Sequence, residues 1–467
     1  MQTAADLVRK AVRPWRINAA CGKFATTTAP PEGERVIGNG GSFWQEGRMH
    51  PGGHTTQRQL LLTLLAAFLG WLFDGMEMGI FPLVARPALQ QMQAASAIEG
   101  EGFVQQWMGM ITALFLLGAA VGGLLFGWLG DKIGRVRAMT LSILCYSLFA
   151  GLSYFAQAPW QLGALRFLGA LGMGGEWSLG VALVMECWPA GNRPLMAGLI
   201  GASANLGYAL IAVVAMRFKV TPESWRWLML IGAAPAALTF FIRLFVPESE
   251  RWVESQKHGP TQPVREIFRP PLLRNTLLAI CFASVALIVT WGIVQWIPLW
   301  ADQMAQANGG HDPRIKAYAQ FWAALGAVIG SLAAPLLGLR FGRRPIYFGL
   351  CIASLLACQW LFRQFTSFGG EFLVAVFVVG ACTASFYGWL PQYLPELFPT
   401  RARATGQGLS FNFGRILAAA GAWHMGDIMA YFQKDYARAG AAISLVYVIG
   451  MALIWAAPET RDKPLPE

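Results

Sequence analysis

The sequence predicts an all-α polytopic membrane protein, with twelve transmembrane helices arranged in two six-helix bundles. Composition is the first reason: hydrophobic residues fill 55% of the 467 positions and charged residues only 13%, against ~25% in soluble domains. The second reason is a series of apolar runs long enough to cross a bilayer. The third is a charged, glycine-rich motif that returns, in altered form, about half a chain later.

Twelve runs approach the ~20 apolar residues that a spanning helix needs. They cover residues 59–83, 104–128, 138–156, 160–186, 195–216, 226–246, 276–300, 318–338, 345–362, 371–394, 404–430 and 438–457. A polar linker at 247–275 divides them, which predicts bundles at 59–246 and 276–457 and a cytoplasmic tail at 458–467. Residues 1–58 contain no spanning run and no signal-peptide core, so we expect a mobile basic cytoplasmic segment there.

The formal charge of +11 raises the possibility of nucleic-acid binding, but the basic residues fall in short segments between apolar runs. Positive-inside topology explains them better, so we expect no nucleic-acid partner. The favoured topology has both termini cytoplasmic in a multi-pass protein of the cell (inner or plasma) membrane, a monomer in the lipid bilayer. The seven cysteines are scattered without ligand spacing, which predicts no metal, no cofactor and no structural disulfide.

An internal repeat supports duplication of a six-helix unit. The basic end of segment 127–137 returns in segment 337–344, where Leu339 takes the place of Asp131. Within these segments Arg135 matches Arg343 at a spacing of 208 residues, and two further pairs, Glu186 with Glu396 and Arg193 with Arg403, match at a spacing of 210. Parallel repeats of this kind are typical of secondary transporters.

The motifs resemble the major facilitator superfamily over about residues 59–463. Segment 127–137 is similar to the family's loop between helices 2 and 3, and segments 166–175, 247–252 and 458–460 are similar to further family motifs. Within the superfamily, segments 74–77, 174–177 and 395–406 resemble the metabolite:proton symporters, a group with sialic-acid, aromatic-acid, nicotinate and short-chain carboxylate carriers. Segment 291–298 lacks the helix 7 motif of the fungal lactate permeases. The resemblance implies alternating access and proton-coupled symport of a small organic anion.

Four charged residues are candidates for proton coupling. Asp74 and Glu77 stand three residues apart on one helix face, where an ionised carboxylate is costly unless it is paired or wet. The expected topology brings Glu77 and Arg166 to similar depth, and the resemblance favours Glu77 as the proton carrier, with a permanent ion pair as the alternative. Glu176 is either a second protonation site or a neutral packing residue.

Arg415 is the candidate anion-binding residue. It lies ten residues after Thr405, which is ~15 Å along a helix and places it near mid-membrane. A guanidinium stays charged there and presents a fork that suits a carboxylate. The alternative is an arginine held by backbone carbonyls or by Tyr387 and Gln392. Neutral residues expected to line the same cavity are Asn205, Gln295, Trp296, Tyr387, Trp389 and Asn412. His424 is expected to be a packing residue, with a proton relay as the alternative.

Asp131 is a gating candidate. On the family pattern its carboxylate faces the positive N-terminal end of helix 11 across the interface between the halves, with Arg135 nearby, and holds an outward-open state. A cytoplasmic belt of ion pairs around it would consist of Glu186, Arg193, Glu396 and Arg403. The absence of an acid at Leu339 predicts that the second half lacks a full latch. Charges that serve topology alone are the alternative.

Other functions remain open at this stage. One is a carrier of a neutral solute such as a sugar, and another is a transporter-like membrane sensor without turnover. A membrane enzyme is disfavoured, because the chain contains no GxxxxGK[ST], HExxH or GxSxG motif. We therefore expect no enzymatic activity.

Overall fold

The computed structural model describes residues 57–96, 102–218, 220–257, 262–309, 312, 314–433 and 435–466. The predicted mobile segment 1–58 thus falls outside the described residues, apart from its last two positions. Every element in the described ranges is helical.

In the described residues, the N-terminal half has seven α-helices, of which the first five are long, and the short 3₁₀ helix η1 (Ser153–Phe155). The α-helices are α2 (Gln57–Ser96), α3 (Gly102–Ile133), α4 (Arg135–Leu152), α5 (Pro159–Cys187), α6 (Arg193–Arg217), α7 (Trp225–Ile231) and α8 (Ala236–Phe245). Two short helices follow in the linker, α9 (Glu250–Gln256) and α10 (Pro263–Ile267).

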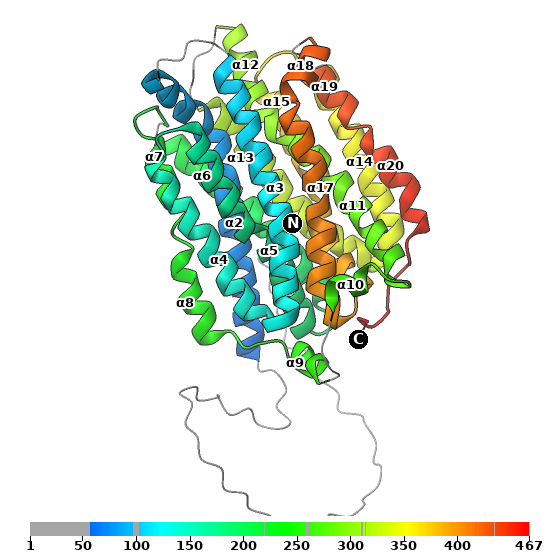
Figure 1. Ribbon diagram of the computed structural model, residues 1–467. Helices are drawn as coiled ribbons and strands as arrows, with labels where there is room; N and C mark the ends of the chain where they lie inside the picture. Colours follow the sequence, from blue (N-terminus) through cyan, green and yellow to red (C-terminus); the bar gives the residue numbers. More distant parts are fainter. Residues whose placement is uncertain are drawn as a thin grey trace, which may run out of the picture. The chain divides into compact units, whose positions relative to one another are not determined.

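The C-terminal half repeats this order with more interruptions. Its elements are α11 (Leu272–Gly292), η2 (Val294–Trp296), α12 (Ile297–Ala307), α13 (Ile315–Phe341), α14 (Arg343–Gln364), α15 (Gly370–Ala384), α16 (Phe386–Tyr393), η3 (Leu394–Leu397), η4 (Thr400–Ala402), α17 (Arg403–Trp423), α18 (Met425–Tyr431), α19 (Tyr436–Ile443), α20 (Val446–Leu453) and η5 (Ile454–Ala456). The long helices run side by side, with α9 and α10 at one end of them (Figure 1). We call this end the linker face and the opposite end the far face.

Ten spans in the described residues are long and apolar enough to cross a membrane. The two other predicted runs, 226–246 and 404–430, are helical as well. The first is broken into α7 and α8 around Gly232 and Pro235, and the second into α17 and α18 after Trp423. Helix α17 faces the interior and has buried polar residues such as Asn412 and Arg415. These polar residues lower the mean hydropathy of the helix.

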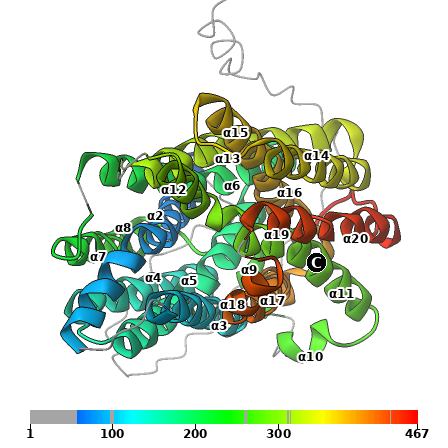
Figure 2. The same cartoon turned by 90° about the horizontal axis from the view of Figure 1, so that it is seen from above.

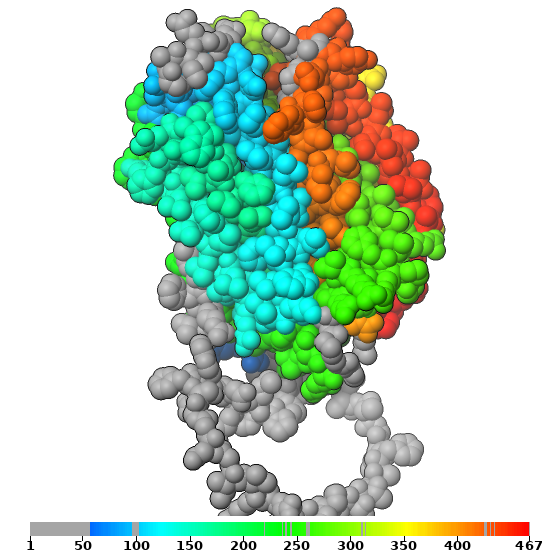
Figure 3. All heavy atoms as spheres, viewed as in Figure 1, coloured from blue at the N-terminus to red at the C-terminus, as the bar shows by residue number. Residues whose placement is uncertain are grey.

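The halves meet along two seams. Helix α3 packs along α17, and α6 packs along α13 (Figure 2). The space-filling view shows the atoms of α3, in cyan, against those of α17, in orange, over much of the visible face (Figure 3). Glycines make the first seam close: a Cβ on Gly408 would lie 2.2 Å from the carbonyl oxygen of Gly123.

Gly122 tests this close packing inside the N-terminal half. A Cβ there would lie 1.9 Å from the backbone oxygen of Leu171, so Gly122→Ala must displace α3 from α5. We expect the thermal midpoint in detergent to fall by an amount corresponding to ~1–3 kcal/mol. Gly349→Ala is the control, since nothing lies within 4 Å of its Cβ position and alanine favours a helix. Equal midpoints for the two variants would contradict the packing argument.

Candidate functional site

A cavity of about 470 Å³, open solvent included, lies between the two halves. Helices α2 and α6 supply one wall, with Trp71, Met78, Ala204, Asn205 and Tyr208. The C-terminal half supplies the other wall, with Leu287, Thr290, Trp291, Gln295, Tyr387 and Arg415. We call it the central cavity. Its wall is mostly apolar and aromatic with a few polar groups, as is usual in small-molecule sites.

Arg415 is the charged group in the wall of the central cavity. Its side chain is 2% exposed, and it forms no ion pair with a described carboxylate. Its Nη1 donates a 2.5 Å hydrogen bond to Asn412, and its guanidinium lies 5.4 Å from the ring centre of Phe411. Asp74 is close enough to interact with it electrostatically. The guanidinium thus keeps binding capacity for an anion that enters the cavity.

Asn412 supports this arginine from the side away from the cavity. Its Nδ2 donates to the carbonyl oxygens of Gly174 and Gly408, both at 2.9 Å, and its Oδ1 accepts from Arg415. The amide therefore ties α17 to α5 and orients the guanidinium. Asn412 was expected to line the cavity, and the structure places it behind the wall instead.

Two carboxyl groups face each other beside the cavity. Asp74 of α2 and Glu176 of α5 are 0% and 2% exposed and lie within hydrogen-bonding reach of each other. None of their four oxygens has a donor among the described residues. Gly70 makes room for this contact, since a Cβ there would lie 1.7 Å from Glu176 Oε1. Two adjacent carboxylates repel each other unless a proton is held between them.

Glu77 and Arg166 form a separate ion pair one turn further along α2. Both side chains are buried, and Arg166 Nη1 donates to Glu77 Oε1. The guanidinium also lies 5.0 Å and 4.7 Å from the ring centres of Phe81 and Phe115. Asp74 and Glu77 are thus neighbours in sequence that have different partners, Glu176 and Arg166. The sequence alone did not assign these two partners.

The neutral residues predicted for the cavity divide into two groups. Asn205, Gln295 and Tyr387 line it, and the Tyr387 hydroxyl donates to Thr290 at 2.9 Å. Trp296 instead faces pockets nearer the far face.

Trp389 was also expected at the cavity, and this expectation is not met. It packs against Tyr347 and Tyr393 in the core of the C-terminal half, and its Nε1 donates to the carbonyl oxygen of Arg343 at 3.1 Å. It lies two residues after Tyr387, about half a turn further along α16 toward the linker face. His424 is exposed, 3.0 Å from Asp427, and is therefore neither a packing residue nor part of the cavity.

Aromatic residues close the cavity toward the linker face. Trp177 stacks on Phe411 at 3.8 Å between ring centres, and Trp71 packs against both rings at 6.3 Å. Sequence reasoning missed Trp71, although it lies three residues before Asp74 and hence on a neighbouring part of the same helix face. It also missed Tyr208, one turn after Asn205 on α6.

Asp131 connects the halves at the linker face. At the end of α3, its carboxylate accepts hydrogen bonds from the backbone N–H groups of Thr405 at 2.8 Å and Ala404 at 3.3 Å, and from the Thr405 hydroxyl at 2.5 Å. These donors are at the N-terminus of α17, where the helix dipole is positive. Arg135 donates to the same carboxylate at 2.6 Å.

Arg135 extends this connection, which we call the latch. Its guanidinium also contacts Glu186 at 3.0 Å and the carbonyl oxygen of Thr400 at 2.8 Å, and Glu186 pairs in turn with Arg403 at 3.0 Å. All four charged side chains of the latch, Asp131, Arg135, Glu186 and Arg403, are fully buried. Buried charged groups of this kind depend on one another, since removal of one leaves its partner unpaired.

Two expected members of the cytoplasmic belt take no part in the latch. Arg193 donates to the carbonyl oxygen of Trp188 at 3.0 Å and forms no ion pair with a described carboxylate. Glu396 pairs with Arg343 at 2.8 Å inside the C-terminal half. Leu339, in the place of Asp131, is 39% exposed and makes no link between the halves.

The chain after α20 also reaches the latch. Arg403 Nη2 donates to the carbonyl oxygen of Pro466 at 2.8 Å, and Leu465 beside it is only 5% exposed. From the linker, Trp252 Nε1 donates to the backbone oxygen of Asp131 at 3.0 Å. The latch is therefore covered by α9 and by the C-terminal residues.

Glu248 and Glu459 cap equivalent helices in the two halves. Each accepts from the first backbone N–H of a helix after a glycine with positive φ: Arg135 donates to Glu248 at 2.8 Å and Arg343 to Glu459 at 2.9 Å. Burial raises the pKa of Glu248 in spite of these donors. Burial acts to raise the pKa of Glu459 as well. Because Glu459 is more exposed than Glu248, the backbone N–H donors outweigh burial and its pKa is lowered.

Glu459→Gln tests the second cap by its pH dependence. A carboxyl whose pKa is lowered in the folded protein stabilises the folded protein at pH values above the ordinary pKa of 4.5. This stabilisation is lost as the pH falls through the pKa of the carboxyl in the folded protein. We expect the variant to melt below wild type at pH 7 and the gap to close below about pH 4.5. Glu371→Gln, at an exposed carboxyl, is the control; a gap that persists at low pH would argue against a charge effect.

Two helical halves around a buried cavity, joined at one face by a buried network of ion pairs, are the architecture of a secondary membrane transporter. Residues 63–422 match the model of the Major Facilitator Superfamily. The chain belongs to this superfamily and is a transporter, not an enzyme. The fold expectation of an all-α protein with two membrane-embedded bundles is thereby confirmed.

Individual relatives agree with this assignment. A metabolite transport protein of Haemophilus influenzae is 30% identical over 373 residues, covering 76% of this chain and 88% of that protein. The cis,cis-muconate transport protein of Acinetobacter baylyi is 25% identical, over 86% of this chain and 92% of its own length. Among solved structures, the proton:xylose symporter XylE superposes with a TM-score of 0.69 at 17% identity, covering 87% and 98% of the two chains.

Proposed function

We propose that this transporter carries a small organic anion, a carboxylate, aromatic acid or sugar acid, together with protons by alternating access. The observation on which this rests is Arg415, a buried guanidinium in the wall of the central cavity that forms no ion pair with a described carboxylate and interacts electrostatically with Asp74 of the Asp74 and Glu176 carboxyl pair. A fixed cation in one half and a titratable acid pair in the other are what anion:proton symport requires. The muconate-carrying relative supports an organic acid as the substrate.

Coupling follows from competition for Arg415. When the acid pair holds no proton between its members, Asp74 attracts the guanidinium and opposes the binding of a second anion. When a proton occupies the pair, this attraction weakens and the guanidinium is available to a substrate carboxylate. Proton and anion then favour each other's binding, which is a coupling free energy between two sites. In this scheme Glu77 and Arg166 are a structural pair, and the acid pair replaces Glu77 as proton carrier.

Alternating access follows from the latch. The structure holds the halves together at the linker face through Asp131, Arg135, Glu186 and Arg403. The basic connections of the linker face support a cytoplasmic location for it by the positive-inside rule, with both termini inside the cell. The latch then closes the cytoplasmic side in the outward-facing and occluded states, and its bonds break when the cavity opens inward.

The test is uptake by purified protein in liposomes, with and without an inward proton gradient. The panel contains cis,cis-muconate, gentisate, nicotinate, N-acetylneuraminate, xylose and glucose. We expect accumulation of one or more of the acids, driven by the gradient and abolished by a protonophore. Uptake of sugars alone would replace the proposal by a neutral-solute carrier. Binding of a panel acid without uptake would point to a sensor.

A further inference from the structure

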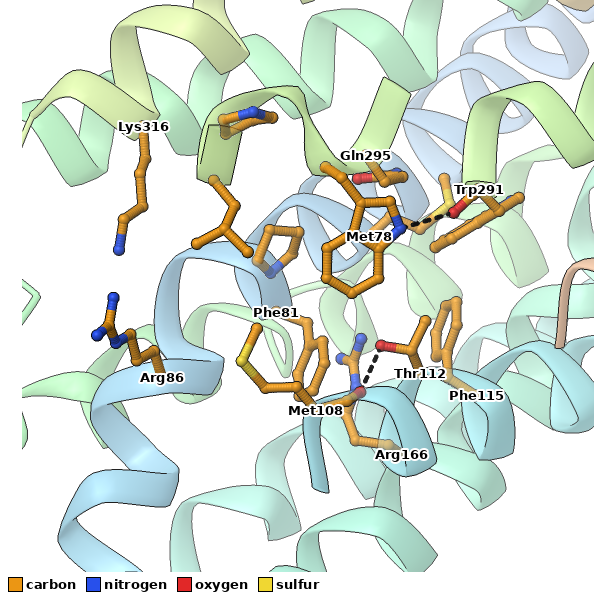
Figure 4. A pocket seen from close by; sticks show the side chains of 14 residues that line it. Met78, Phe81, Arg86, Met108, Thr112, Phe115, Arg166, Trp291, Gln295 and Lys316 are labelled. Atoms are coloured by element: carbon orange, nitrogen blue, oxygen red, sulfur yellow. Dashed lines mark hydrogen bonds between the residues drawn. The ribbon is translucent and has the colours of Figure 1, made fainter. Parts of the chain in front are cut away.

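A second pocket is shown in Figure 4. Its α2 residues extend from Met78 to Arg86, beyond those of the central cavity, so it lies on the far-face side of that cavity. Its volume is about 740 Å³, open solvent included. The two cavities share three wall residues, Met78, Trp291 and Gln295. Gln295 accepts a hydrogen bond from Tyr208, so α6 and η2 are joined at this partition. We call the second pocket the vestibule, because a solute entering from the far face meets it before Arg415.

The charges in the vestibule wall are all positive. Arg86, Arg166 and Lys316 line it, and no aspartate or glutamate does. Arg166 is committed to Glu77, and Lys316 lies 3.4 Å from Asp302, a long contact. Arg86 forms no ion pair with any described carboxylate. With respect to the described residues, the wall therefore contains one cation without an ion pair, Arg86, and one that is loosely held, Lys316.

The side chains of Arg86 and Lys316 point into the pocket. Arg86 comes from α2 and Lys316 from α13, in opposite halves, and the two extend toward each other on the same side of the pocket (Figure 4). Basic residues are disfavoured on the outer side of a membrane protein, and long ones near helix ends usually reach for lipid headgroups. Here they line a pocket whose remaining wall is mostly apolar and includes the aromatic rings of Phe81, Phe115, Trp291 and Trp296.

We propose that Arg86 and Lys316 form a second, weaker carboxylate-binding site, which receives the organic acid before it passes to Arg415. This rests on the proposed function for the substrate class and the orientation. The carboxylate lies between the two cations and the apolar part of the acid against the aromatic wall. Because the cations belong to different halves, a bound carboxylate draws the halves together at the far face. Anion arrival thereby promotes closure of the outer side.

The kinetic test compares Arg86→Gln and Lys316→Gln with two matched controls, using the panel acid that wild type accumulates fastest. Each variant should raise KM about five- to tenfold and leave the maximal rate within about twofold, since it weakens capture rather than translocation. Raising the ionic strength should raise the wild-type KM and have little effect on Arg86→Gln. Arg314→Gln removes an exposed arginine of the same segment, and Asp302→Asn removes the partner of Lys316; both should keep the wild-type KM.

The outcomes separate the two proposals. If the acid is transported and the Arg86 and Lys316 variants match Arg314→Gln, the vestibule site is wrong and the proposed function stands. If Asp302→Asn raises KM as much as Lys316→Gln, the lysine acts through its ion pair, which also overturns the site. A second measurement does not need transport: quenching of tryptophan fluorescence by 4-nitrobenzoate in Arg415→Ala. Weak saturable quenching that Arg86→Gln removes supports the site, and identical quenching in both proteins contradicts it.

Discussion

Arg415→Ala is expected to reduce organic-acid uptake about 100-fold or more at concentrations below KM, because a buried charge pair with the substrate is worth several kcal/mol. Arg415→Lys should retain part of the activity, since it keeps the charge and loses the planar fork. The measurement is initial uptake in proteoliposomes under a fixed proton gradient, together with anion affinity from calorimetry.

The control for Arg415 is Leu417→Ala. Leu417 lies two residues further along the same helix and is 49% exposed on its outer surface, so its loss should leave transport unchanged. Because Arg415 is also bonded to Asn412, the thermal midpoint of each variant must be recorded beside its activity. Full uptake by a well-folded Arg415→Ala protein would remove the residue from the substrate site.

Asp74→Asn and Glu176→Gln are each expected to abolish gradient-driven accumulation while exchange of labelled for unlabelled acid continues. Each change removes one of two carboxyls that share a single proton, so the proton no longer travels with the substrate. The double variant should be no more impaired than either single one, which is the non-additivity expected of groups that act as a unit. Accumulation and exchange are measured on the same liposomes.

Glu77→Gln distinguishes the proposed proton carrier, the Asp74 and Glu176 pair, from the carrier that the family resemblance favours, Glu77. It leaves Arg166 buried without its partner, so we expect a loss of stability of roughly 3–5 kcal/mol and a lower yield of folded protein. The protein that does fold should keep its response to the proton gradient. A stable Glu77→Gln protein that exchanges substrate and does not accumulate it would return the role of proton carrier to Glu77.

The helices were predictable because their cause is local: a run of about twenty apolar residues has few alternatives in a bilayer. The interruptions were harder to predict. Gly232 and Pro235 split one predicted span, yet the same residue types lie inside unbroken helices elsewhere, as Pro335 does in α13. What separates these cases is the packing of neighbouring helices, and a single sequence does not state it.

In the site, too, some contacts could be predicted from the sequence, whereas others depend on how neighbouring helices pack. Asp131 could be matched with the start of α17 because a family motif supplied the partner. The Asp74 and Glu176 contact depends on the rotation of α5 relative to α2 and on the space left at Gly70, so hydropathy and spacing do not predict it. Trp389 was expected at the cavity together with Tyr387, but the two residues that separate them correspond to about 200° around a helix, so the two side chains lie on different faces.

The contact between Arg403 and Pro466 makes position 465 a natural place for a reporter. Leu465 is buried beside Arg403, which pairs with Glu186 across the halves in the latch, and it lines neither the central cavity nor the vestibule. In the proposed cycle the latch opens when the cavity opens inward, and a polarity-sensitive dye attached there would then pass from an apolar to an aqueous surrounding. Its emission would record openings of the cytoplasmic side in real time, without a change in the wall of the central cavity or the vestibule.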